Sequence, residues 1–73
     1  MKTTYQVRRE NWSRYTGNTQ EVVFETTCKR KAEKFLNSMA KAYNKSNVVV
    51  WVRDGYFQLP DFDCEYFICK FHL

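Results

Sequence analysis

The spacing of apolar residues changes along the chain, and these changes predict where its elements lie. Residues 3–10 alternate, with Tyr5 and Val7 on one side, as a half-buried β-strand does. Residues 19–26 are rich in β-branched and aromatic side chains and predict a second strand. A polar stretch around Gly17 separates the two runs, so we expect a β-hairpin with a long loop.

A helical repeat follows these two strands. Its apolar residues recur one, three or four positions apart, on one stripe of a 3.6-residue helix: Cys28, Ala32, Phe35, Leu36, Met39, Ala40 and Tyr43. Thr26 or Thr27 can supply an N-cap oxygen, and the polar residues 44–47 can end the helix. We therefore predict a helix over residues 27–44.

The last third of the chain predicts three more strands. Residues 48–53 and 56–59 flank the dipeptide Asp54-Gly55, which supplies the two positive-φ positions of a tight hairpin turn. After a polar link, residues 64–73 alternate again and predict a final strand. The element order is then β-β-α-β-β-β, and the simplest fold is a small α+β domain with one amphipathic helix packed on one face of an antiparallel sheet.

The register of the Asp-Gly turn assigns side chains to the two faces of this sheet. We expect the core between helix and sheet to contain Phe35, Leu36, Met39, Val50, Val52, Phe57, Phe67 and Phe71. The other face has no covering helix, and we expect it to carry Trp51, Arg53, Tyr56, Tyr66 and Ile68. An uncovered apolar patch of this kind marks an interface, either with a partner or in a homodimer. Alternatively, residues 13–18 fold over it as a loop.

Composition places the chain in one class. A length of 73 residues fits one domain, residues 1–73, and 44% hydrophobic with 18% aromatic residues is a heavy apolar load for so small a body. No apolar run approaches the length that spans a bilayer, and the N-terminus lacks the apolar core of a secretory signal. We therefore expect a cytoplasmic protein, without membrane contact, whose three cysteines are reduced.

Charge is distributed unevenly. Residues 1–45 hold ten Lys or Arg and four acids, a net of +6, whereas residues 46–73 hold two and four, a net of −2. The basic side chains concentrate on the outer face of the predicted helix, with Arg30, Lys34 and Lys41 among them. This face either keeps the domain soluble or contacts an anion, such as nucleic-acid phosphates or an acidic protein.

Catalytic and metal-binding patterns are missing from the sequence. His72, the one histidine, lies near the end of a strand and has no placed nucleophile beside it. The carboxylates of Asp61, Asp63 and Glu65 alternate, but no glycine shapes the loop for a hard cation. The cysteines lack zinc-type spacing, and the glycines form no phosphate-binding loop. We expect no enzyme activity, no metal and no cofactor.

A chain of this size, rich in Lys, Tyr, Trp and Phe and without an enzyme motif, resembles the small accessory proteins that bacteriophages encode to inhibit or redirect host machinery. The resemblance implies a non-catalytic inhibitor in the host cytoplasm that occludes a host enzyme, a defence complex or a toxin. A nucleic-acid-binding module or a purely structural subunit are the alternatives. The residues that we expect to bind the partner are Trp51, Arg53, Tyr56, Tyr66, Arg30, Lys34 and Lys41.

Overall fold

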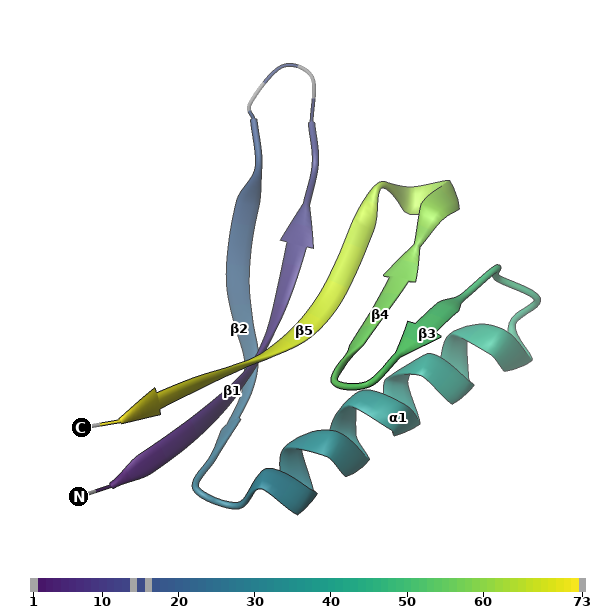
Figure 1. Ribbon diagram of the computed structural model, residues 1–73. Coiled ribbons are helices and arrows are strands. Elements are labelled where there is room, and N and C mark those ends of the chain that lie inside the picture. The colour runs from purple at the N-terminus through teal and green to yellow at the C-terminus, as the bar shows by residue number, and fades with distance from the viewer. Residues whose placement is uncertain (1, 14, 16, 73) are drawn as a thin grey trace.

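The computed structural model describes residues 2–13, 15 and 17–72 of the chain (Figure 1). Its elements follow the predicted order, and the predicted α+β class with one helix and an antiparallel sheet is confirmed. The strands and helices are β1 (Thr3–Asn11), β2 (Thr19–Thr26), α1 (Lys29–Lys45), β3 (Trp51–Arg53), β4 (Tyr56–Leu59), the 3₁₀ turn η1 (Pro60–Phe62) and β5 (Cys64–His72). Neither described helix is long and apolar enough to cross a bilayer.

The five strands form one antiparallel sheet in the order β2-β1-β5-β4-β3. The β1–β2 hairpin and the β3–β4 hairpin lie on opposite sides of β5, which pairs with one strand of each. Figure 1 shows α1 along one face of this sheet, where it contacts β1, β2, β4 and β5. The other face, which we call the open face, is covered by neither helix of the described residues.

The ends of α1 differ from the prediction in detail. The helix begins at Lys29 after Cys28, whose side chain forms no capping hydrogen bond. Thr26 does not cap the helix itself. Its Oγ1 accepts a hydrogen bond from the backbone N–H of Cys28, the residue before the helix, at 3.2 Å. At the other end Asn47 has a φ of 62°, and the next amide, that of Val48, donates to the carbonyl of Tyr43 at 3.1 Å. This is a Schellman closure with Asn in place of Gly.

That closure also shortens the next strand. The prediction placed a strand over residues 48–53, but β3 contains only Trp51–Arg53. The amide of Val48 is used to close the helix and therefore does not join the ladder. The other predicted strands agree with the structure within one residue, except that Leu73, the predicted end of the last strand, lies outside the described residues.

The core lies between α1 and the sheet. Three helix residues are buried there, spaced four apart: Ala32, Leu36 and Ala40. The sheet contributes Val7, Phe57, Leu59, Cys64 and Tyr66. Of the predicted core, Leu36 and Phe57 are buried, and the residues that pack at its margin are Phe35, Met39 and Val50.

Three of the predicted core residues are not in the core. Val52 points to the helix side as expected, but it is 59% exposed because β3 is an edge strand of the sheet. Phe67 and Phe71 lie on the open face, because β5 is turned over relative to the prediction. Correspondingly, Tyr66 and Ile68, predicted on the open face, point toward the helix.

The path through η1 determines this orientation of β5. Asp63, directly after the 3₁₀ turn, has a φ of 50°, and the ladder resumes with Cys64 opposite Leu59. In that register Tyr66 lies opposite Phe57, on the side of the helix. A shift of one residue would exchange the two faces of the strand, and β5 has aromatic side chains on both.

Candidate functional site

The open face carries a row of side chains that crosses four strands. Arg53 pairs with Tyr56, and Tyr56 with Phe67. Phe67 in turn pairs with Arg8 of β1. Directly opposed residues of antiparallel strands lie on the same face, so two aromatic rings are flanked by two guanidinium groups. With Trp51, which is 57% exposed on the same face, these residues form what we call the aromatic surface.

A second row beside the first has a different character. It runs from Trp51 through Gln58, Glu65 and Glu10 to Gln20. Glu10 therefore lies beside Arg8 along β1, and Glu65 lies beside Phe67 along β5. The open face is mixed in charge, unlike the basic surfaces that track a phosphate backbone.

The β1 side of the open face is internally hydrogen-bonded. The Arg8 guanidinium donates to Oε1 of Gln6 from Nε at 3.0 Å and from Nη2 at 2.7 Å, and it stands 5.1 Å from the ring centre of Phe71. Oε1 of Glu10 accepts from Nε2 of Gln20 at 2.6 Å. Because these polar groups are already paired, this side offers a preorganised surface rather than free donors.

The β3–β4 side of the open face is less occupied. Tyr56 donates its hydroxyl proton to Oε1 of Gln58 at 3.1 Å. The pKa of Tyr56 is raised, mainly by burial and to a smaller extent by hydrogen bonding to Glu65. Arg53 is exposed and has no carboxylate within ion-pair distance among the residues that the structure describes. Trp51 and Arg53 are therefore the groups on this surface that a partner can reach most freely.

The loop that was the alternative cover for this face does not shield Trp51. Trp12 at its start donates its indole N–H to Oε2 of Glu10 at 2.9 Å. Tyr15 is 96% exposed and so covers nothing. Arg14 and Thr16, which belong to the same predicted loop, lie outside the described residues.

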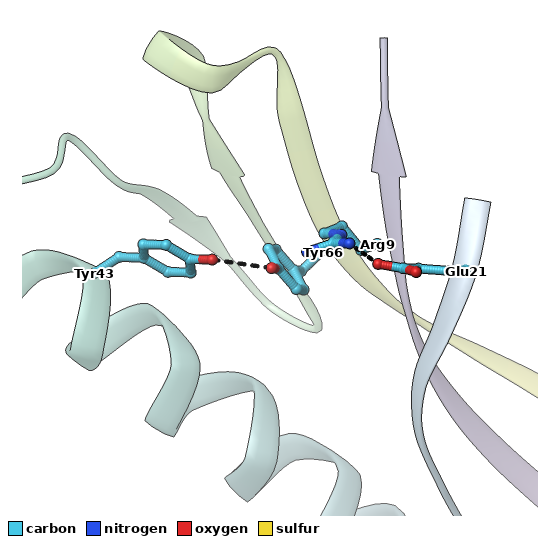
Figure 2. Close-up of polar contacts among 4 residues, drawn as sticks. All are labelled: Arg9, Glu21, Tyr43 and Tyr66. Atoms are coloured by element: carbon cyan, nitrogen blue, oxygen red, sulfur yellow. Dashed lines mark hydrogen bonds and ion pairs between the residues drawn. The ribbon is translucent and has the colours of Figure 1, made fainter. Parts of the chain in front are cut away.

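Tyr66, a predicted partner-binding residue, is buried on the opposite side of the sheet. It is 1% exposed, and its hydroxyl lies 3.0 Å from the hydroxyl of Tyr43 on α1 (Figure 2). Burial is the main cause that raises the pKa of Tyr66 to about 12; the bond to Tyr43 adds to the rise and the guanidinium of Arg9 opposes it. Arg9 forms an ion pair with Glu21 on the neighbouring strand. In this position Tyr66 supports the core and cannot contact a partner.

The predicted basic residues gather elsewhere. Arg30, Lys34 and Lys41 are exposed on α1 and line one shallow hollow of about 380 Å³. The sheet separates them from the aromatic surface, because α1 covers the other face. The structure therefore brings six of the seven predicted residues into two groups. One group is Trp51, Arg53 and Tyr56, and the other is the three helix cations. Tyr66 belongs to neither group.

Sequence reasoning missed two members of the aromatic surface, Arg8 and Phe67. Phe67 was assigned to the core, since the register of β5 could not be predicted. The alternation of residues 3–10 implies that Arg8 lies on the other side of the strand from Tyr5 and Val7, but nothing in the sequence indicated that β5 would lie beside it. Only the long-range pairing of β1 with β5 brings Arg8 next to Phe67.

Groups with reactive side chains are scattered. Among residues 2–13, 15 and 17–72, no three His, Cys, Asp or Glu side chains are placed to share a metal ion. The three thiols are free, with Cys28 exposed, Cys69 half-buried and Cys64 buried, and burial raises the pKa of Cys64. The chain matches no known family, and no curated protein or solved structure is significantly similar to it.

Proposed function

We propose that the protein is a non-catalytic binding protein that inhibits or modulates a partner protein by covering part of its surface. The observation that carries this proposal is the aromatic surface, on the sheet face that no described helix covers. Tyr56 and Phe67 lie there between two arginines, with Trp51 beside Arg53. Trp, Tyr and Arg are the residues that most often dominate the binding energy of protein interfaces.

The charge of the open face favours a protein partner over a nucleic acid. Bases stacked on Tyr56 and Phe67 would bring their phosphates close to Glu65 and Glu10 in the adjacent row. That contact is repulsive, whereas a protein can place its own cations there. The nucleic-acid reading is therefore less well supported on this face.

The dimensions of the domain also suit an occluding inhibitor. The backbone measures 39 by 30 by 16 Å, so the sheet face spans the two long dimensions of a thin body. A standard interface buries about 800 Å² on each partner, which a face of this extent can supply. The resemblance to phage accessory proteins points in the same direction, toward a host enzyme, a defence complex or a toxin in the cytoplasm as the target.

A comparison of variants tests the proposal. The protein and its Trp51→Ala and Tyr56→Ala variants are used as bait in host-cell lysate, and the affinity of the captured partner is then measured with purified components. Each truncation should weaken binding by about 2 kcal/mol or more, roughly 30-fold, if these aromatics are interface anchors. Tyr15→Ala removes an aromatic that is 96% exposed outside the surface and serves as the matched control.

Three results would contradict the proposal or alter it. A partner that binds both truncations as tightly as the unmodified chain would show that the aromatic surface is not the interface. A partner lost only on removal of the helix cations would move the interface to α1. Light scattering that detects a dimer, dissociated by Trp51→Ala, would make a second copy of this chain the occupant of the surface.

A further inference from the structure

The outer side of α1 is strongly and almost uniformly basic. The helix holds six cations and one acid, Glu33. Glu33 lies 3.9 Å from Nζ of Lys29, so one cation has a partner four residues away. The other five are exposed and have no carboxylate at ion-pair distance within the described part of the chain: Arg30, Lys31, Lys34, Lys41 and Lys45.

Helix stability does not explain this arrangement. Three cations occupy the first turn of α1, where no acidic residue is present. The positive end of the helix dipole disfavours each of them by about 0.3–1 kcal/mol. Most of the solvent-exposed cations of α1 also lack the acid four residues away that stabilises an isolated helix. An anion bound along the helix would relieve both penalties.

The basic side chains line a hollow rather than a convex surface. Arg30, Lys34 and Lys41 lie one to two turns apart on one stripe, which we call the basic stripe. Asn37, Ser38 and one acid, Glu33, also line the hollow, and Glu33 is 3.9 Å from Nζ of Lys29. The hollow has a volume of about 380 Å³. Lys41 lies eleven positions after Arg30, a length of about 16 Å along the helix axis.

The chemistry of the stripe identifies its ligand class. Arginine, lysine, serine and asparagine are the side chains that proteins use to contact phosphate oxygens. An aromatic or aliphatic anchor, which a protein interface needs at its centre, is missing from the residues that line this hollow. A phosphodiester backbone needs no such anchor, because its affinity comes from cations and released counterions.

We propose that the basic stripe of α1 binds the phosphodiester backbone of a nucleic acid, at a site separate from the aromatic surface. The stripe and the aromatic surface lie on opposite sides of the sheet, so neither blocks the other. Binding is independent of base sequence, since the three cations of the stripe contact phosphate and not the bases. This inference does not rest on the proposed protein partner, and either can fail alone.

Salt dependence provides the quantitative signature. Three cations that each neutralise one phosphate give a slope of log K against log salt of about −2 on a single strand and about −2.7 on a duplex. The variant Lys34→Gln with Lys41→Gln should make the single-strand slope less steep by about 1.4. It should also weaken binding at low salt by roughly ten-fold or more.

The experiment titrates the full chain into fluorescently labelled, mixed-sequence RNA of about 20 nucleotides. Anisotropy is measured from about 50 to about 200 mM sodium chloride. The matched control is Lys2→Gln with Lys70→Gln, which removes the same charge from exposed residues outside α1. Circular dichroism verifies that both double variants are folded. We expect the stripe variant to lose affinity and slope, and the control to retain both.

Several outcomes would overturn the inference. Equal losses in the two double variants would mean that only net charge matters. Equally tight binding of polyglutamate, added as a competitor, would assign the stripe to an acidic protein segment instead. Loss of RNA binding in Trp51→Ala would show that the bases stack on the aromatic surface, whereas retention supports two separate sites.

Discussion

The hydroxyl pair between α1 and β5 predicts a specific pattern of mutational effects. The hydroxyls of Tyr43 and Tyr66 are 3.0 Å apart, and Tyr66 is 1% exposed. Tyr43→Phe leaves a buried hydroxyl without this partner, which costs about 1–3 kcal/mol of unfolding free energy. Tyr66→Phe removes the buried group itself and leaves the half-buried hydroxyl of Tyr43, so it should cost less, about 0.5–1.5 kcal/mol. The double variant should lose less unfolding free energy than the sum of the losses in the two single variants.

The same pair predicts a pH dependence. The folded state raises the pKa of Tyr66 from 10 to about 12, so the folded chain holds this proton more tightly than the unfolded chain. Each pKa unit corresponds to 1.36 kcal/mol, which gives a contribution of about 2–3 kcal/mol. That contribution is fully present below pH 10 and is lost as the pH rises through 12. The Tyr66→Phe variant does not show this loss of stability at high pH. The raised pKa of Tyr56 contributes equally to the unmodified chain and to the variant.

Urea unfolding followed by tryptophan fluorescence measures these differences. The free energy of unfolding is determined for the unmodified chain and Tyr66→Phe from about pH 8 to about pH 11.5. The stability of the unmodified chain should fall more steeply than that of the variant above pH 10. Parallel curves would refute the burial of Tyr66, and a larger loss for Tyr66→Phe than for Tyr43→Phe would refute the assigned hydrogen bond.

Two further predictions concern the hairpin turn and the thiols. Gly55 has a φ of 67°, and no atom lies within 4 Å of a Cβ added there. Gly55→Ala should therefore destabilise the fold through backbone strain alone, by about 1–2 kcal/mol measured in urea unfolding. Gly55→Asn should destabilise it less, because asparagine adopts this conformation more readily. An aromatic disulfide reagent should modify exposed Cys28 quickly and Cys64 only as the chain unfolds, because Cys64 is 5% exposed and burial raises its pKa. Peptide mass mapping distinguishes the two, and equal labelling rates would contradict the burial.

Local signals in the sequence predicted local structure well. The Asp54-Gly55 turn predicted the pairing of Trp51 with Gln58 and of Val52 with Phe57, and both pairs are present. The helical stripe predicted α1 to within two residues at each end. In each case the decisive interaction joins residues close in sequence, so the pattern alone constrains the structure.

Long-range pairing could not be predicted in the same way. β5 has Tyr66 and Ile68 on one side and Phe67 on the other, so hydrophobicity does not favour either orientation. The left-handed backbone of Asp63 selects one of them, and asparagine or glycine would be a stronger signal for such a position. Because β5 was inverted, the membership of the aromatic surface was only partly correct.

The position of β5 between two hairpins has a consequence for how the chain folds. Each hairpin is local, but an isolated pair of strands is at best marginally stable in water. β5 joins the two hairpins into one sheet, and its last residue pairs with the first residue of β1. Thr3 and His72 are 69 positions apart in sequence, yet Oγ1 of Thr3 lies 3.2 Å from Nδ1 of His72. The nascent chain therefore cannot complete its sheet until the ribosome has released β5, and closing so long a loop slows the final step. Covalently joining the start of β1 to the end of β5 would make the pairing of these two strands local in sequence.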